Sequence, residues 1–127
     1  MNFSFDPEVG LVIVQSQLVG PSGTVTLNLA LDTGASRTLL NEDLLISVGY
    51  DLANAVGHSK MTTGSKVEPV ALICIDKLIA LGQERSAMIV VSHTLPPSAS
   101  VDGLLGLDFL RGLNLNLDFR IGLILLT

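Results

Sequence analysis

The chain has 127 residues, of which 48% are hydrophobic and only 15% are charged, and its formal net charge is −5. This length is enough for one hydrophobic core and predicts a single domain over residues 1–127. The acidic balance argues against nucleic acid and anionic membranes as partners, because both attract a basic patch. The first residues show no secretory signal, and the sequence therefore predicts a cytoplasmic protein.

The first two predicted elements form a β-hairpin. Residues 11–18 and 24–31 are rich in Val, Leu, Ile and Thr, and residues 20–23 between them, Gly-Pro-Ser-Gly, have the composition of a turn. Polar residues interrupt this stretch at short intervals, which is typical of paired strands and not of a membrane span. The second strand runs directly into Asp32.

A short strand and a helix are predicted next. Residues 38–40 favour a strand, and Asn41 is a suitable N-cap for a helix over residues 42–48. Acidic residues in the first turn support this start, and Gly49 is expected to end the helix.

A second hairpin is predicted from residues 58–61 and 67–75 around a polar tip, residues 62–66. This tip is interpreted either as a flexible flap over a binding site or as an ordinary hairpin turn, since Gly, Ser and Lys are common in both. The apolar run around Cys74 predicts that the only cysteine is a buried structural thiol, and a single cysteine excludes an internal disulfide.

The rest of the chain predicts more strands and one further short helix. Strands are expected at residues 77–81, 87–91, 113–119 and 121–126, and residues 101–106 lead into a Leu-Leu-Gly segment. The helix is expected at residues 107–111, where Gly112 would end it. Many short strands with little helix are typical of an all-β fold, either a closed barrel or a sandwich.

The segment at the end of the second predicted strand has residues that are typical of a catalytic site. An apolar strand leads into Asp32, Thr33 and Gly34, and therefore delivers a carboxylate into a protected interior. The Thr33 hydroxyl can hydrogen-bond back into the scaffold, and Gly34 lets a partner or substrate approach the backbone closely. Together with Leu104-Leu105-Gly106 far downstream, Asp-Thr-Gly-Ala resembles the paired signature of the retropepsin-like, or retroviral-type, aspartic proteases. The chain is similar to a non-viral member of that family.

The resemblance implies a closed, mostly antiparallel β-barrel of the acid-protease type with one or two short helices, assembled as a homodimer. Hydrolysis by this route needs two carboxylates, and the chain has one Asp-Thr-Gly, so the second Asp32 is expected from a partner across a two-fold axis. The two would activate a water that attacks a peptide or protein substrate, with no cofactor and no metal. Because the pair shares a proton, activity is expected to favour acidic pH.

The resemblance also assigns supporting roles. The Thr33 hydroxyl would bond across the dimer axis, Gly34 would contact substrate, and Ala35 completes the supporting loop. The residues expected to form the flap over the substrate are Thr62, Thr63 and Gly64.

Two further segments are compared with the retroviral enzymes. Residues 113–126 match the segment that joins an intermolecular sheet, and the apolar end of this segment is expected to need a partner strand. The viral enzymes commonly carry an acid and an arginine that form an ion pair where this chain has Ser36 and Leu107.

Other interpretations are left open. The chain can instead be a non-catalytic peptide-binding or dimerisation module with the same fold, or a domain from a longer polyprotein. The other downstream acids are expected to serve turns, caps or the surface: Asp102, Asp108 and Asp118. His58 and His93 stand apart from any cluster with metal-ligand spacing, so no zinc site is predicted.

Overall fold

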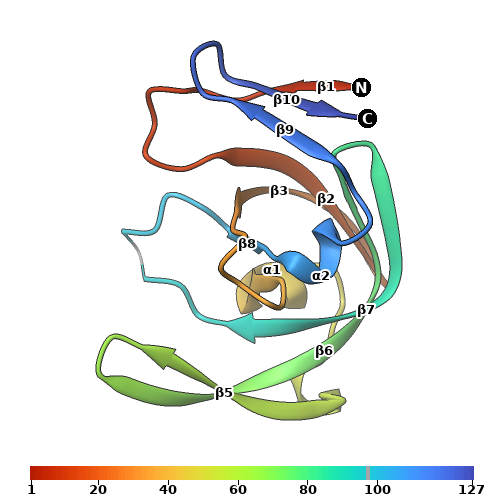
Figure 1. Ribbon diagram of the computed structural model, residues 1–127. Coiled ribbons are helices and arrows are strands. Elements are labelled where there is room, and N and C mark those ends of the chain that lie inside the picture. The colour runs from red at the N-terminus through yellow and green to blue at the C-terminus, as the bar shows by residue number, and fades with distance from the viewer. Residues whose placement is uncertain (97) are drawn as a thin grey trace.

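The computed structural model describes residues 1–96 and 98–127, with Thr63 described by its backbone alone. Its strands, in chain order, are β1 (Asn2–Ser4), β2 (Ile13–Gly20), β3 (Gly23–Leu31), β4 (Leu39–Asn41), β5 (Gly57–Thr63), β6 (Lys66–Ala80), β7 (Gln83–His93), β8 (Gly103–Leu105), β9 (Leu115–Asp118) and β10 (Leu123–Leu126). Its helices are α1 (Glu42–Ser47), the 3₁₀ turn η1 (Leu52–Asn54) and α2 (Leu107–Leu110). The predicted mostly-β architecture with two short α-helices is confirmed (Figure 1).

Within the described residues, six strands close into a β-barrel. Hydrogen bonding runs in the order β2-β3-β8-β4-β7-β6, and an additional pairing of β6 with β2 joins the two ends. Most neighbours are antiparallel, but β3 runs parallel to β8 and β4 runs parallel to β7. The parallel pair of β3 and β8 places Leu31 opposite Leu105, so the two sequence motifs leave the barrel side by side.

β6 is one strand of 15 residues, where the sequence predicted two separate strands. Its first part pairs with β5, its last four residues pair with β2 along the same edge, and β7 occupies the other edge. Along this edge of β6, Tyr50 lies between the part that pairs with β5 and the part that pairs with β2. The Asp76 N–H donates to Tyr50 Oη at 2.7 Å, and Tyr50 Oη donates to Val19 O at 2.7 Å. The strand therefore continues through Asp76, because a side chain satisfies the backbone group there.

The turn from β6 to β7 is tighter than predicted. Leu81 and Gly82 have φ angles of 53° and 69°, and these two residues alone connect the strands. Two residues with positive φ match the right-handed twist of the flanking strands. β7 consequently begins at Gln83, four residues before the predicted strand at residues 87–91.

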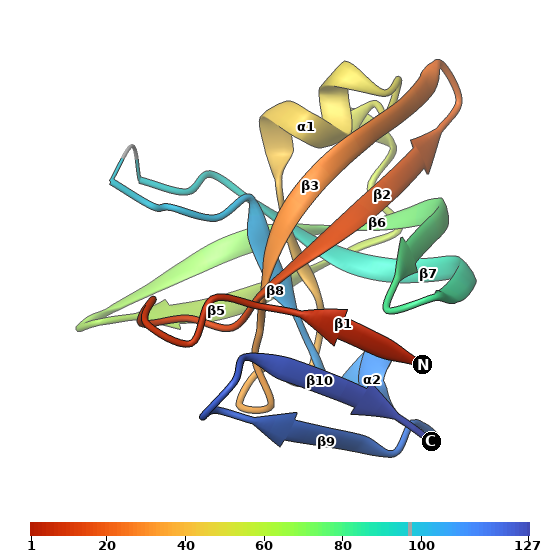
Figure 2. The same cartoon turned by 90° about the horizontal axis from the view of Figure 1, so that it is seen from above.

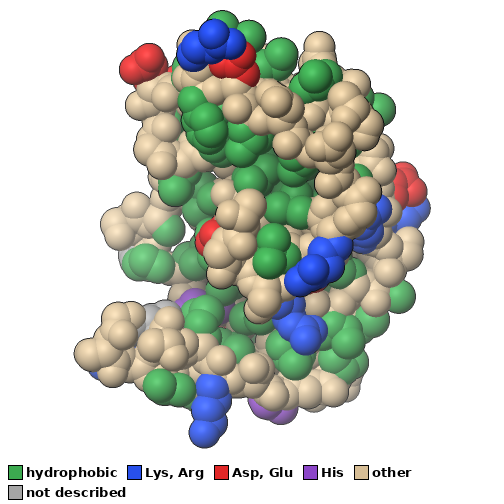
Figure 3. All heavy atoms as spheres, in the orientation of Figure 1, with side chains coloured by type: hydrophobic (Ala, Val, Ile, Leu, Met, Phe, Trp, Pro, Cys, Tyr) green, Lys and Arg blue, Asp and Glu red, His purple; other side chains and the backbone are tan. Residues whose placement is uncertain are grey.

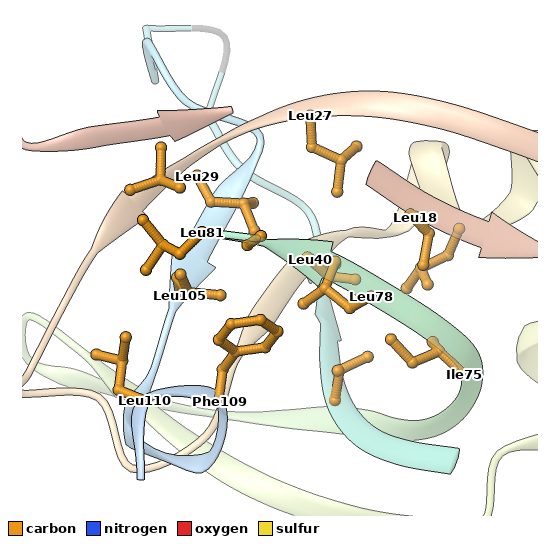
Figure 4. Close-up of a cluster of buried hydrophobic side chains, with 14 of the residues drawn as sticks. Leu18, Leu27, Leu29, Leu40, Ile75, Leu78, Leu81, Leu105, Phe109 and Leu110 are labelled. Atoms are coloured by element: carbon orange, nitrogen blue, oxygen red, sulfur yellow. The ribbon is translucent and has the colours of Figure 1, made fainter. Parts of the chain in front are cut away.

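The hydrophobic core fills the barrel interior. In Figure 4, leucines from several strands converge around the ring of Phe109 from α2. Leu29, Leu40, Leu105 and Phe109 are all fully buried. Burying one such side chain contributes about 1.5–3 kcal/mol. The core therefore holds α2 and β8 against β3 and β4, and these are the elements that carry the motifs.

β1, β10 and β9 form a separate three-stranded sheet beside the barrel, with both chain ends close together (Figure 2). The sequence did not predict β1, because three residues are too few to show an alternation. β10 is the central strand: Ile124 lies opposite Phe3 on one side and Leu117 on the other. The expectation that this apolar segment needs a strand from a partner is corrected, since both of its neighbours come from its own chain.

Cys74 is exposed, and the prediction of a buried thiol is wrong. Its neighbours Ile73 and Ile75 are 3% and 1% exposed. Successive side chains of a strand point to opposite faces, so an outward residue can stand inside an apolar run.

In the part of the chain that is described, no helix has the length and hydrophobicity needed to cross a membrane.

Candidate active site

Asp32 is the first residue after β3, where the strand leaves the barrel. Its backbone N–H donates to Leu105 O at 3.0 Å, and the Leu31 N–H donates to Val12 O at 2.9 Å. The end of β3 is thus fixed on both sides. The half-buried Asp32 side chain is oriented by the Gly34 N–H, which donates to Oδ1 at 2.8 Å.

Residues 33–35 form the loop that follows. The Ala35 N–H donates to Asp32 O at 3.2 Å, and Ala35 O accepts from the Leu107 N–H at 2.8 Å. Thr33 and Gly34 are exposed at the surface of the single chain, as a contact with a partner or substrate requires. A Cβ added to Gly34 would lie 3.1 Å from Asp32 Oδ1, so a side chain at this position would crowd the carboxylate.

Asp108 anchors the far end of this loop. Its carboxylate accepts from the Thr38 N–H at 3.0 and 2.9 Å, from Thr38 Oγ1 at 2.7 Å and from the Phe109 N–H at 2.9 Å. Thr38 Oγ1 in turn accepts from the Gly106 N–H at 3.1 Å. Asp108 is therefore a structural acid that ties the loop after Asp32 to the second motif, whereas the sequence suggested a turn, a cap or the surface.

Gly106 explains why the second motif ends in glycine. A Cβ at this position would lie 2.8 Å from Ala35 O and 2.8 Å from the carbonyl carbon of Arg37, both of which are backbone atoms. Backbone cannot move aside cheaply at such distances, so only glycine lets the two motifs approach this closely. Leu107 follows directly and donates its N–H to the loop, in the place where the viral enzymes commonly have an arginine.

A recess of about 280 Å³ lies between this loop and the β5–β6 hairpin. Its lining residues are Gly34, Ala35, Ser36, Arg37, Leu39, Ser59, Lys60, Met61, Val70, Val91 and Leu104. Figure 3 shows the molecule hollowed at this side, between the hairpin and the rest of the chain, with hydrophobic atoms on the walls. Gly34 lines the recess and donates to Asp32 Oδ1, so the recess lies next to the carboxylate. A molecule that placed a side chain in the recess would therefore lie close to Asp32.

The structure brings together only part of the predicted site. Gly34 and Ala35 line the recess, whereas Thr62 and Gly64 are exposed near the hairpin tip and are not among its lining residues. The side chain of Thr63 lies outside the described residues. The hairpin contributes the three residues before Thr62 on β5 and Val70 on β6, and sequence reasoning missed all of them. The alternation of β5 could have placed one or two of them toward the recess, but not the recess itself.

No group of three or more His, Cys, Asp or Glu residues that could hold a metal ion occurs among the described residues. His93 instead lies 3.6 Å from Glu68, measured from Nε2 to Oε2.

Comparison with known protein families shows which family the chain belongs to. Residues 22–112 match the family described as "gag-polyprotein putative aspartyl protease", and this range contains both motifs and the recess. The chain belongs to this retropepsin-like family. The expectation drawn from Asp-Thr-Gly-Ala and the downstream glycine is thereby confirmed.

The fold of this retropepsin-like protein agrees with that assignment. The chain is similar to the crystal structure of a retropepsin-like aspartic protease from Rickettsia conorii, with a TM-score of 0.67 and 19% sequence identity. The match covers 99% of this chain and 88% of the Rickettsia chain. No curated protein matches the sequence.

Proposed function

We propose that the chain is an aspartic endopeptidase that acts as a homodimer, with Asp32 of each protomer flanking the attacking water. The observation that supports this most directly is the placement of Asp32. It follows a buried strand, one of its oxygens is oriented by the Gly34 N–H, and the chain has a single Asp-Thr-Gly. One Asp32 carboxylate is half of the required pair. In a dimer with a two-fold axis, the same residue of the second copy provides the other half.

The reaction needs no cofactor. One Asp32 takes a proton from the water, the resulting hydroxide attacks the peptide carbonyl carbon, and the protonated Asp32 of the partner subunit donates to the carbonyl oxygen. Collapse of the tetrahedral intermediate breaks the C–N bond, and the leaving nitrogen receives a proton from a carboxyl group. The rate is then expected to be highest at acidic pH, where exactly one proton is shared by the pair.

Exposed apolar side chains support an assembly with a second copy. Val9, Leu11, Phe119 and Ile121 are 46%, 43%, 61% and 67% exposed. Phe119 contacts Phe5 edge to face with ring centres 5.7 Å apart, which joins the β9–β10 turn to the segment after β1. Figures 1 and 2 place this turn and the β1–β2 connection on the side toward which the β5–β6 hairpin projects. A second copy that covered them would also approach the recess and the Asp32 loop.

Peptide cleavage tests this function. Wild-type protein is incubated at acidic pH with an unstructured protein, and the products are identified by mass spectrometry. Asp32→Asn should lower the rate by about 10²-fold or more, as expected for the loss of an acid or base. Asp43→Asn makes the same chemical change at an exposed acid of α1 and should leave the rate unchanged.

The rival interpretation is a non-catalytic module that binds peptides or dimerises. It predicts binding without cleavage in both the wild type and Asp32→Asn. Cleavage that persists at the wild-type rate in Asp32→Asn would show that another group performs the chemistry.

A further inference from the structure

The recess beside Asp32 shares part of its wall with a second hollow. A second hollow of about 380 Å³ is lined by Ser36, Arg37, Ala87, Met88, Ile89 and Asp108. Ser36 and Arg37 line both hollows. We refer to the two hollows together as the groove, because Ser36 and Arg37 lie in the wall of both.

The charges along this groove contrast with those of the whole chain. The chain carries a net charge of −5, yet the charged residues that line the recess are Arg37 and Lys60, both cationic. The second hollow adds Asp108, whose carboxylate already accepts hydrogen bonds from Thr38 and Phe109. The groove therefore offers positive charge beside apolar walls.

The two cations stand on opposite sides of the recess. Arg37 belongs to the loop after Asp32, and Lys60 belongs to β5 of the hairpin. Both side chains are exposed. The hydrogen bond from Arg37 Nη1 to Ile89 O, at 3.4 Å, uses one of the five N–H donors of the guanidinium group. Both residues can therefore meet a carboxylate that enters the groove from solvent.

An extended peptide sets the spacing of the side chains that such a groove can bind. Alternate residues of a strand point to the same side and lie roughly 7 Å apart. We propose that the groove selects peptides that place an apolar side chain in the recess and an acidic side chain two residues away, at Arg37, with Lys60 favouring the same charge. This proposal rests on the proposed function, because it names the substrate class of that site.

The expected preference is moderate. Ion pairs between exposed groups are weakened by solvent, so a peptide with Glu at the charged position should be cleaved about three- to tenfold more efficiently, in kcat/KM, than one with Lys. The preference should decrease as salt is raised, because salt screens exposed charges. A preference that came from the shape of the groove, and not from its charge, would not decrease with salt in this way.

Cleavage of a peptide library shows which substrate positions are selected. A matched pair of peptides then tests whether charge causes the selection. Cleavage sites of the wild type should show apolar residues at one position and Glu or Asp two residues away. A Glu peptide and a Lys peptide with the same remaining sequence are then compared on the wild type, on the double variant Arg37→Glu/Lys60→Glu, and on Arg111→Glu. Arg111 is exposed after α2 and lines neither hollow, so Arg111→Glu shows the effect of reversing a charge outside the groove. Thermal unfolding of each variant shows that the fold is kept.

The double variant should prefer the Lys peptide, whereas Arg111→Glu should keep the wild-type preference. If Asp32-dependent cleavage occurs but the Glu to Lys ratio is near one, or is the same in the double variant, the inference is wrong and the proposed function stands. If no Asp32-dependent cleavage occurs, the proposed function fails. Binding of the two fluorescently labelled peptides to Asp32→Asn protein and to its Arg37→Glu/Lys60→Glu version then decides the charge preference by the same comparison.

Discussion

Thr38 and Asp108 are separated by 70 positions in the sequence, and the backbone N–H and the hydroxyl of Thr38 both donate to the Asp108 carboxylate. Thr38 is fully buried, so its N–H has no access to water. The contact joins the end of the Asp32 loop to the start of α2.

Asp108→Ala should lower the free energy of unfolding by about 2–4 kcal/mol, because buried donors lose a charged acceptor. Asp108→Asn keeps one oxygen acceptor and should cost less. Urea unfolding measures both, with Asp43→Ala as the control at an exposed acid. A cost no larger than that of the control would mean that Asp108 does not hold the loop.

Gly106→Ala should destabilise the protein by more than about 1 kcal/mol, since the new Cβ would meet the backbone of Ala35 and Arg37. The matched control is Gly112→Ser, in the turn after α2. A Cβ at Gly112 meets nothing within 4 Å, so only the strain of its positive φ remains. Under the proposed function, Gly106→Ala should also lower peptide cleavage by more than its loss of stability explains. Equal stability of the two variants would contradict the close approach of the motifs.

Phe119→Asp/Ile121→Asp should shift the protein from dimer to monomer in sedimentation experiments, since charges would replace the exposed apolar side chains of the β9–β10 turn. Under the proposed function, cleavage should fall with the dimer fraction, because each protomer would supply one Asp32. Ile46→Asp/Val56→Asp is the control, since these apolar residues are also exposed, at 53% and 57%, and lie elsewhere in the fold. A wild type that is fully active as a monomer would overturn the dimer model.

Tyr50→Phe should lower the free energy of unfolding by about 1–3 kcal/mol, because the Asp76 N–H and Val19 O both lose their partner. Burial raises the pKa of Tyr50 above its usual value. A raised pKa in the folded state means that this group's contribution is complete below about pH 10 and decreases as pH rises through the folded-state pKa. Urea unfolding of the wild type and the variant at pH 7 and at pH 10.5 checks this. A difference between the two proteins that does not shrink with pH would contradict it.

The sequence predicted those parts of the protein that are determined by residues close to one another in the chain. Residues 11–18 and 24–31 were predicted to form a hairpin from their composition and the turn between them, and the structure places it at β2 and β3. Asn41, the predicted N-cap, caps α1 by accepting from the Asp43 N–H. The tripeptide Asp32-Thr33-Gly34 and the glycine at 106 identify the family because their chemistry tolerates few substitutions. These features depend on neighbours in the chain, and a single sequence contains them.

The features that were missed depend on contacts between distant segments. Nothing near Asp76 shows that a tyrosine hydroxyl will replace a strand there, and nothing near Lys60 shows that it will face Arg37 across a recess. Cys74 was misplaced because composition was considered before alternation. β1 acquires its structure only from β10, which lies at the other end of the chain.

β6 continues from the β5–β6 hairpin into the barrel wall as one strand, so movement of the hairpin is coupled to the barrel wall. Its outer half has only β5 beside the recess, while its inner half seals the barrel against β2 and β7. A peptide that lifted the hairpin would therefore twist the strand at the interval where Tyr50 bridges Val19 and Asp76. We therefore expect movement of the hairpin to depend on the contacts of Tyr50 at the barrel wall as well as on the hairpin tip.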